Sequence, residues 1–400
     1  MHSGDNRMKY KILVADDSPS YLKVIEEIFK IVGEQFDLVF AENGEVACEK
    51  ALAIIPDMIL MDVIMPQLNG IQALKILKSN PLTEDIPVIV LSATESLKAA
   101  FEAGATDFIT KPFRHYELVI RVKSALNLVE KLRLVKQQKE ILLQQKKDII
   151  ADISYSKRIQ NAILPSNVNI KKLFPEHFIF NVPKNIVSGD FYWVGEKNGY
   201  RIFAVADCTG HGISGAFMTM AGIAFLNEIL NKYTFNQASE ILSLLRQKVI
   251  SLLQQKGEEG EAADGMDIAL CMFNQDTMEL QYAGANNPLY IISDNVLTII
   301  KADRMPIGIH VNYNNPFTNH MVKIKSGDMI YLFSDGYADQ FGGTDGKKFR
   351  YKNFQELLLR ISEMPVEKQE EELNKTFFEW KGSEDQIDDI LIAGFRLIMS

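Results

Sequence analysis

The sequence has few of the residues on which disulfide-stabilised and zinc-binding proteins depend. Its 400 residues include three cysteines, Cys48, Cys208 and Cys271, and six histidines, none of which forms an HExxH pattern. Three widely spaced cysteines exclude a disulfide framework and a cysteine-based zinc site, and they are typical of a reducing compartment. Any metal that this chain binds is therefore expected to have oxygen ligands.

Long apolar runs and an excess of basic charge are also missing. The longest apolar runs, such as AFMTMAGIAFL, are shorter than the roughly 20 residues of a membrane-spanning helix. No signal-peptide pattern opens the chain. The net charge of −9 argues against nucleic acid as a partner. We therefore expect a cytoplasmic protein that binds neither membrane nor nucleic acid, with two domains and a connector.

Residues 8–125 read as one domain in which short apolar runs alternate with amphipathic helical patterns. The runs are KILVAD, DLVFAE, DMILMD, PVIVLS and DFITKP. Five strands that alternate with helices predict an α/β domain with a doubly wound, parallel, five-stranded sheet.

Polar residues follow these runs at the point where each strand is expected to end. They are Asp16, Asp17, Asp62, Ser92 and Lys111. Strand C-termini share one edge of such a sheet, so these side chains should converge there. Crowded carboxylates suit Mg²⁺, which Asp17 would hold with help from Asp16. Asp62 would accept a phosphoryl group that Lys111 and Ser92 hold.

The segments LVADDS, LMDVIMP, VLSA and FITKPF closely resemble the receiver (CheY-like) domain of two-component response regulators. The resemblance implies that Asp62 and the carbonyl of Ile64 also bind the Mg²⁺ ion. It further implies that Phe108 is the aromatic residue whose rotation couples the site to the surface. A histidine kinase or phosphotransfer protein would be the upstream partner.

Residues 126–164 are expected to form a helical linker, because residues 126–160 contain neither proline nor glycine. An apolar stripe in steps of four and three predicts a coiled coil that would make the protein a homodimer. The stripe consists of Leu128, Leu132, Val135, Leu142, Ile149 and Ile153, with Lys139 and Lys146 in its gaps. A single amphipathic helix lying on a domain would show a similar stripe.

Residues 165–400 change to β-rich segments around two long helices, expected at about 213–232 and 238–255. Short connections predict antiparallel sheets covered by helices. Asp190 and Asp388 begin predicted strands, whereas Asp207 and Asp335 end them. Antiparallel neighbours place the start of one strand beside the end of the next, so the four carboxylates should share one edge.

An aspartate cage without histidine or cysteine ligands indicates Mg²⁺ or Mn²⁺. Two such ions can activate a bridging water for attack on phosphorus. The glycines after Asp207 would let the backbone approach the ions, and the carbonyl of Cys208 is a further candidate ligand.

These segments, with QNAILP, YAGANNPLYI and MPIGI, resemble the metal-dependent PPM (type 2C) Ser/Thr protein phosphatases of the SpoIIE-like branch. The resemblance implies a PPM β-sandwich flanked by helices and metal roles for the four aspartates. Asp389 stands where the family has a second polar residue. The substrate would be a phosphoprotein such as a phosphorylated anti-sigma-factor antagonist. We find no clear counterpart of the phosphate-binding arginine of the animal-type enzymes.

Three further features have two interpretations each. Asp264 and Asp267 are ligands of a third metal or solvated residues at a strand edge. His211 protonates a leaving serine or supports the ligands. The glycine-rich, basic segment 340–351 is a flap over substrate phosphate or a solvated loop.

Together the motifs predict a response regulator in which phosphorylation of Asp62 controls a Ser/Thr protein phosphatase. One alternative is a non-catalytic phosphatase fold that sequesters a signalling partner. Another keeps the enzyme and assigns it small-molecule phosphates.

Overall fold

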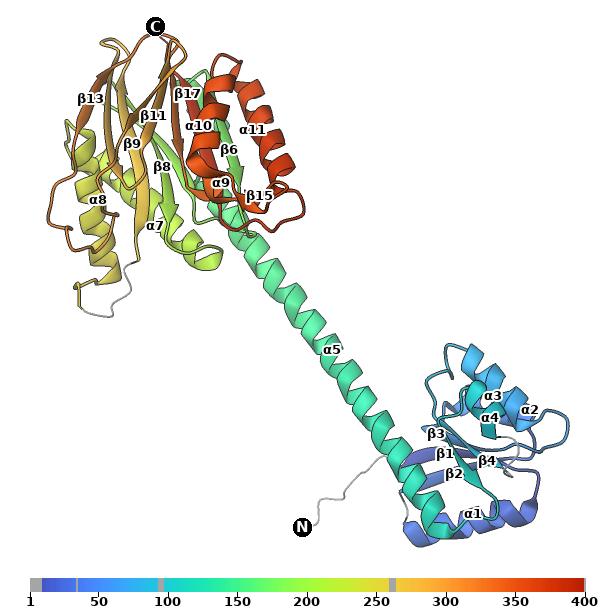
Figure 1. The fold of residues 1–400 in the computed structure, drawn as a ribbon. Helices are drawn as coiled ribbons and strands as arrows, with labels where there is room; N and C mark the ends of the chain where they lie inside the picture. Colours follow the sequence, from blue (N-terminus) through green and yellow to red (C-terminus); the bar gives the residue numbers. More distant parts are fainter. Residues whose placement is uncertain (1–8, 34, 93–96, 259–263, 399–400) are drawn as a thin grey trace, which may run out of the picture. The chain divides into compact units, whose positions relative to one another are not determined.

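The structure is a computed structural model, and it describes residues 9–33, 35–92, 97–258 and 264–398. The chain divides into two compact units, 1–146 and 147–400 (Figure 1). Each unit is described by itself.

The first unit contains a parallel five-stranded sheet with the strand order β2-β1-β3-β4-β5. Its strands are β1 (Tyr10–Ala15), β2 (Phe36–Ala41), β3 (Met58–Asp62), β4 (Val88–Ser92) and β5 (Asp107–Thr110). Every residue of β3 and β4 is buried, as continuous apolar runs in a parallel sheet require. The predicted doubly wound sheet is confirmed.

Helices cover both faces of this sheet. They are α1 (Pro19–Val32), α2 (Gly44–Ile54), α3 (Gly70–Ser79), α4 (Leu97–Glu102) and the start of α5 (His115–Ile163). Ile25 of α1 and Leu118 and Val122 of α5 share one core with the sheet. Ala47 of α2 and Leu74 of α3 belong to the core on the other face.

Helix α5 is a continuous helix of 49 residues that begins inside the first unit. Its first turns pack in the core through Leu118, Val122 and Leu126, which are buried. Beyond them, stripe residues such as Leu132 and Leu142 are exposed. The composition change at residue 126 therefore marks the loss of burial along the helix, and no helix boundary lies there.

The second unit is a sandwich of two antiparallel five-stranded sheets with the orders β13-β10-β9-β8-β7 and β12-β11-β14-β17-β6. The first sheet contains β7 (Phe191–Lys197), β8 (Tyr200–Cys208), β9 (Met266–Asn274), β10 (Glu279–Ala285) and β13 (His320–Lys323). The second contains β6 (His177–Val182), β11 (Leu289–Ser293), β12 (Val296–Ile300), β14 (Met329–Phe333) and β17 (Ile390–Arg396). Phe203 and Leu280 of the first sheet pack between the sheets against Ile330 and Leu391 of the second.

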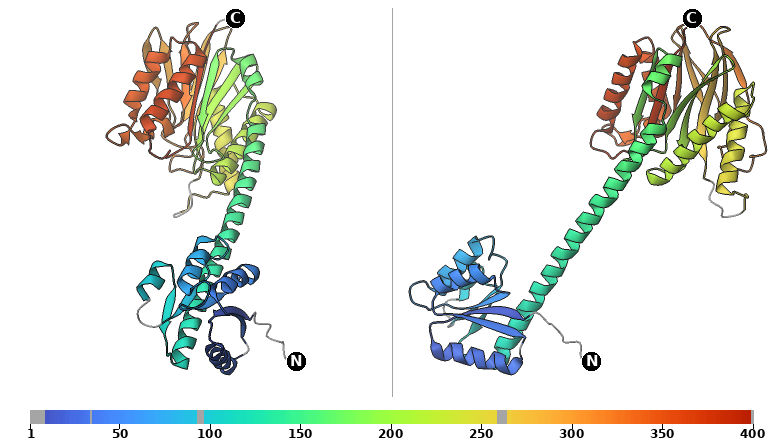
Figure 2. Two further views of the ribbon diagram at one scale, coloured as in Figure 1. Left: turned by 90° about the vertical axis from the view of Figure 1, so that its right-hand side faces the viewer. Right: turned by 180° about the vertical axis from the view of Figure 1, so that it is seen from behind.

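Helices flank the sandwich on both outer faces, as two further views also show (Figures 1 and 2). Helices α7 (Ile213–Lys232) and α8 (Ala238–Leu253) pack on the sheet that contains β8. Helices α10 (Arg350–Ile361) and α11 (Val366–Lys381) pack on the sheet that contains β14. The predicted sandwich and the first helix pair are confirmed, whereas the sequence reading missed the second pair. Two short helices, α6 (Asn167–Leu173) and α9 (Gly336–Asp339), and a hairpin of β15 (Phe341–Gly342) and β16 (Lys347–Lys348) complete the unit.

Helix α7 is, among the described residues, the one helix long and apolar enough to cross a membrane by length and composition. Ile223, Leu226 and Ile229 of this helix pack in the core beneath the sheet. A core helix passes the same test, so the finding is weak evidence for a membrane span. The cytoplasmic location stays a prediction.

We expect Phe203→Ala to destabilise the sandwich unit by about 3–5 kcal/mol, because it removes a large side chain from a closed core. The Phe203 ring is fully buried and its centroid lies 4.3 Å from that of Phe395 and 5.0 Å from that of Phe174. Calorimetry of the full chain measures the change. The matched control is Phe378→Ala, whose side chain is half exposed; equal losses in the two variants would contradict this core.

Candidate functional site

The first unit brings three carboxyl groups together at the C-terminal edge of its sheet. Asp16 follows β1 and Asp62 ends β3, and ligand oxygens of Asp16, Asp17 and Asp62 all lie within 4.8 Å of one another. Asp16 and Asp62 are buried, whereas Asp17 is exposed. The predicted convergence of these aspartates is therefore present, and hard oxygens at this density fit Mg²⁺.

Lys111 lies between two of these carboxylates. Its Nζ is 2.7 Å from Asp16 Oδ2 and 3.0 Å from Asp62 Oδ1, and it stands over the Tyr21 ring. Burial raises the pKa of Asp62, and the hydrogen bond from Lys111 partly offsets that rise. Burial opposes the ammonium charge, but hydrogen bonds to Asp16 and Asp62 raise the pKa of Lys111 overall. The lysine stays charged, as a group that holds phosphoryl oxygens must.

The remaining predicted receiver residues lie around this edge. Ser92 is buried at the end of β4, where its carbonyl accepts the backbone N–H of Lys111 at 2.9 Å. Ile64 lies in the loop after Asp62 with an exposed side chain. Phe108 is half-buried on β5, where its ring makes an edge contact with Phe101.

The second unit gathers its aspartates at one end of the sandwich. Phe191 pairs with Ala206 in the β7–β8 ladder, so Asp190 and Asp207 are the next pair along it. Asp335 and Asp388 flank β14 and β17 of the other sheet. Ser334 joins the two sheets, because its Oγ donates to Asp190 Oδ2 at 2.5 Å. Four carboxyl groups from four strand ends therefore face one region, as predicted.

The carboxyl groups of the second unit are close enough to influence one another's pKa. Burial raises the pKa of Asp190, and the neighbouring Asp207 raises it further. Burial, then Asp335 and Asp388, raise the pKa of Asp207 to about 8. Burial, then Asp388, raise the pKa of Asp335 to about 6. Protonation or a bound cation relieves the repulsion between such groups, and a set of carboxylate oxygens fits Mg²⁺ or Mn²⁺.

The carboxyl groups of the second unit are less tightly grouped than those of the first unit. Among the described residues, no three of them place ligand atoms within 4.8 Å of one another. Asp190 and Asp207 come from one sheet and Asp335 and Asp388 from the other. This wider spacing is compatible with more than one ion.

The glycines near Asp207 allow the backbone conformation of the loop that follows β8. Gly210 and Gly212 have positive φ angles of 84° and 67°. A Cβ on Gly189 would lie 2.7 Å from the Gly210 carbonyl oxygen and 3.4 Å from that of Cys208. Small residues therefore bring the loop and the segment before β7 into close contact. Burial raises the pKa of the Cys208 thiol, so the thiol stays protonated and is a poor metal ligand. The main-chain carbonyl of Cys208 is therefore the candidate ligand of this residue.

Asp389 holds backbone instead of facing solvent. Its Oδ1 accepts the N–H of Lys184 and its Oδ2 accepts the N–H of Gly189, both at 2.7 Å. The role of Ser334 and this double anchor of Asp389 were missed at the level of sequence. The signals in the sequence that could have indicated these roles are the adjacent pairs Ser334–Asp335 and Asp388–Asp389.

The family model described as "Stage II sporulation protein E (SpoIIE)" matches residues 197–397, half of the chain. The chain belongs to the SpoIIE family. The response regulator receiver domain model matches residues 12–123.

Known proteins resemble the two halves of this SpoIIE family member separately. The SiaA-PP2C domain of Pseudomonas aeruginosa has a TM-score of 0.58 and 31% identity, over 63% of this chain and 98% of that one. The DNA-binding response regulator MtrA of Mycolicibacterium smegmatis is 33% identical over 122 residues, 30% of this chain and 51% of MtrA. The response regulator PleD of Caulobacter vibrioides is 35% identical over 120 residues, 29% of this chain and 26% of PleD. The chain thus spans about half of MtrA and about a quarter of PleD.

The residues left open in the sequence separate in the structure. Asp267 pairs with Asp207 across β8 and β9, and burial raises its pKa, so it belongs to the acidic group. Asp264 is exposed, and its Oδ1 lies 3.4 Å from Thr209 Oγ1. His211 is exposed, and its Nδ1 lies 3.0 Å from Asn185 Nδ2.

Segment 340–351 contains the β15–β16 hairpin. Lys348 Nζ lies 2.8 Å from Asp339 Oδ2 and lowers the pKa of Asp335, although less than burial and three aspartates raise it. The hairpin therefore brings a cation toward the acidic group. Both interpretations of this segment, flap and solvated loop, stay open.

We expect Asp62→Ala to abolish covalent labelling of the chain by a small phosphodonor with Mg²⁺, because Lys111 holds Asp62 in the acidic cluster. Mass spectrometry of the intact chain measures the label. The control Asp37→Ala removes an exposed carboxylate of β2 and should be labelled like the wild type. Equal labelling of the Asp62→Ala chain would refute the assignment of Asp62.

Proposed function

We propose that phosphorylation of Asp62 controls a metal-dependent Ser/Thr protein phosphatase formed by residues 165–400. The observation that carries the proposal is the group of Asp190, Asp207, Asp335 and Asp388, which come from two sheets and interact electrostatically. The same chain also contains a receiver domain. The receiver would comprise residues 8–125 and the linker residues 126–164. Mg²⁺ would serve the receiver, and two Mn²⁺ or Mg²⁺ ions the phosphatase.

The bound ions would supply a hydroxide nucleophile and neutralise phosphoryl oxygens. The chain's own residues would hold this arrangement. Ser334 donates a hydrogen bond to Asp190 Oδ2 and so fixes the position of this carboxyl group. The exposed loop at Thr209–Gly212 borders the acidic group and offers a face to a protein substrate. His211 is the one histidine of this loop, held by Asn185.

A phosphorylated anti-sigma-factor antagonist or a similar regulatory protein is the proposed substrate. A histidine kinase or phosphotransfer protein would act on Asp62, and the protein would work in the cytoplasm as a homodimer through α5. The exposed apolar stripe of α5 supports a coiled coil, because it leaves Leu132, Val135 and Leu142 in solvent in a single chain.

A non-catalytic module that sequesters a signalling partner is the alternative from another class. The complete set of four carboxylates favours the enzyme, because a module that only binds does not need to bury repelling charges. An enzyme for small-molecule phosphates is the second alternative.

We expect Asp207→Asn to abolish Mn²⁺-dependent hydrolysis of p-nitrophenyl phosphate and of phosphoserine proteins by the full chain. Losing a ligand from the centre of the group should cost several kcal/mol of transition-state stabilisation. Turnover should therefore fall below about a tenth of the wild-type value. Asp276→Asn, which changes an exposed aspartate, is the control and should retain activity. A wild-type chain that binds Mn²⁺ and a partner but hydrolyses neither substrate would establish the non-catalytic alternative. Hydrolysis of small phosphates alone would establish the second.

The apolar stripe of α5 allows a test of whether this helix relays the signal from Asp62. Inserting one residue after Gln145 breaks the register of the stripe, and inserting seven restores it. Beryllofluoride, a stand-in for the phosphoryl group on Asp62, should change phosphatase activity in the wild type and in the seven-residue insertion. The one-residue insertion should respond little. Equal responses in all three chains would rule out a relay through α5.

A further inference from the structure

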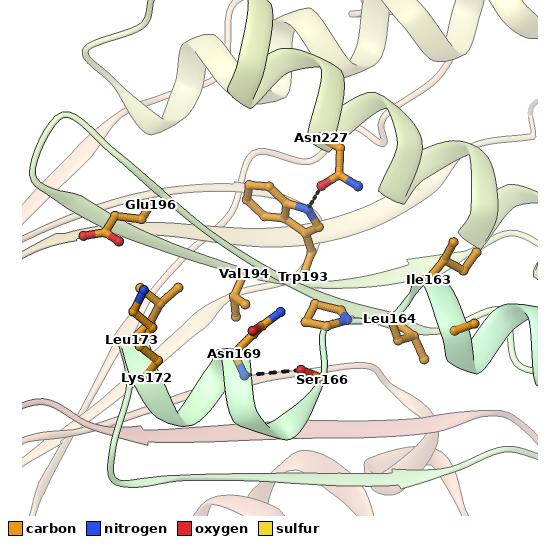
Figure 3. A pocket seen from close by; sticks show the side chains of 12 residues that line it. Ile163, Leu164, Ser166, Asn169, Lys172, Leu173, Trp193, Val194, Glu196 and Asn227 are labelled. Carbon is orange, nitrogen blue, oxygen red and sulfur yellow. Dashed lines mark hydrogen bonds between the residues drawn. The ribbon is translucent and has the colours of Figure 1, made fainter.

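The pocket drawn in Figure 3 does not include the acidic group of the second unit. It has a volume of about 510 Å³ and is lined by residues of α6, β7 and α7, among them Lys172, Trp193 and Asn227. Its lining contains no aspartate. A substrate that reaches the acidic group therefore meets other segments, and segment 340–351 brings a cation next to this group.

Two adjacent lysines of the β15–β16 hairpin have different partners. Lys348 pairs with Phe341 across the hairpin, and its Nζ lies 6.0 Å from the centre of the Phe341 ring and 2.8 Å from Asp339 Oδ2 of α9. Lys347 Nζ lies 3.0 Å from Asp345 Oδ2, in the turn of the hairpin. Successive side chains of a strand point to opposite faces, so Lys348 is the lysine on the side of α9.

Lys348 is held one helical turn from a proposed metal ligand. The N–H of Asp339 donates to the carbonyl oxygen of Asp335 at 3.0 Å, so these two aspartates are one turn apart in α9. Burial, then Asp388 and Asp339, raise the pKa of Asp335, whereas Lys348 lowers it. The charge of Lys348 therefore acts on the acidic group itself.

The hairpin is anchored at its base, which gives Lys348 a defined position. The N–H of Gly343 donates to the carbonyl oxygen of Trp380 in α11 at 2.7 Å, and the N–H of Phe349 donates to that of Gln340 at 2.9 Å. The ring of Phe349 also packs against Trp380, with 5.2 Å between the ring centroids. Residues on both sides of the two lysines are thus attached to the sandwich, which favours a flap over a solvated loop.

Lys348 keeps donors for a second partner. An ammonium group has three N–H donors, and among the described residues Asp339 is the one carboxylate within 4.0 Å of it. The side chain of Lys348 is 44% exposed, so an incoming group can reach it. A phosphate monoester carries more negative charge than a carboxylate and offers three acceptor oxygens. Phosphate can therefore compete with Asp339 for this lysine.

Further positive charge follows the hairpin. Arg350 and Lys352 are exposed at the start of α10. Between them, the ring of Tyr351 lies 6.4 Å from that of Phe333, the last residue of β14. Burial, and after it Asp335, raise the pKa of Tyr351, so this turn of α10 borders the acidic group. Positive charge along this border suits an anionic ligand.

We propose that Lys348 anchors the phosphate group of the substrate by exchanging its ion pair with Asp339 for one with the phosphate. The proposal rests on the phosphatase function proposed above. It supplies a phosphate-binding cation where the sequence has no clear counterpart of the arginine of the animal-type enzymes. The four aspartates would hold the ions, whereas Lys348 would contact the phosphate directly.

The test measures the affinity of the full-length chain for inorganic phosphate by calorimetric titration in the presence of Mg²⁺. Lys348→Met keeps most of the side-chain length and removes the charge, and Lys347→Met is the matched control on the same strand. We expect Lys348→Met to weaken phosphate binding about ten-fold, because it removes a charge-assisted hydrogen bond. Lys347→Met and Lys348→Arg should bind phosphate like the wild type. The receiver is identical in all these chains, so a difference between them reports on the second unit.

Asp339→Asn distinguishes phosphate binding from a purely structural ion pair. This variant removes the partner of Lys348 and leaves the lysine, so it should bind phosphate at least as tightly as the wild type. If the ion pair only secured the hairpin, Asp339→Asn would weaken phosphate binding as much as Lys348→Met does. That result would overturn the proposal.

Kinetics with a phosphoserine protein give a second readout. Lys348→Met should raise KM by about ten-fold and leave kcat nearly unchanged, as the loss of uniform substrate binding does. If Lys348→Met does not fold, Lys348→Gln replaces it. Equal phosphate affinities of Lys348→Met and Lys347→Met, or a wild type that binds no phosphate, would refute the role of Lys348. A chain that binds phosphate as expected and hydrolyses nothing would instead refute the proposed function and leave the role of Lys348 intact.

Discussion

Repulsion between buried carboxylates is the constraint around which the second unit is built. Burial, and after it neighbouring aspartates, raise the pKa of Asp190, of Asp207 and of Asp335, which means that the folded unit resists their negative charge. The receiver meets the same problem with a built-in cation, because Lys111 bonds to Asp16 and Asp62. The sandwich has a weaker counterpart in Lys348, which lowers the pKa of Asp335 less than burial and the neighbouring aspartates raise it.

Holding such a group in place takes rigid backbone around it, and the chain supplies this with small residues and side-chain anchors. Gly210 and Gly212 take up conformations that other residues adopt at a cost, and Gly189 allows close contact. Asp389 uses both oxygens on main-chain N–H groups, which explains why two aspartates stand together at the start of β17. Asp388, the other of the pair, accepts the N–H of Asp389 through its Oδ1 at 2.9 Å.

The sequence predicted those features that depend on local signals. A carboxylate directly after or before an apolar run marks a strand end, so the sequence alone places the two acidic groups at strand ends. The ends of α7 were equally clear, since glycine precedes it and its apolar residues stop at Lys232. The amphipathic pattern of α10, with Phe354, Leu357, Leu358 and Ile361 buried, was present in the sequence and was overlooked. Gln160 had no local signal at all, because its partner is Ser188 and a polar residue in a stripe looks like a weak point of a seam.

Helix α5 has contacts in each of the two units. In the receiver, the Arg121 guanidinium of α5 lies 5.7 Å from the centre of the Phe108 ring, and Arg121 also pairs with Asp107 at 2.6 Å. The helix then runs without proline or glycine to Gln160, which binds Ser188. The same helix therefore contacts the aromatic residue expected to switch and the segment that precedes Asp190.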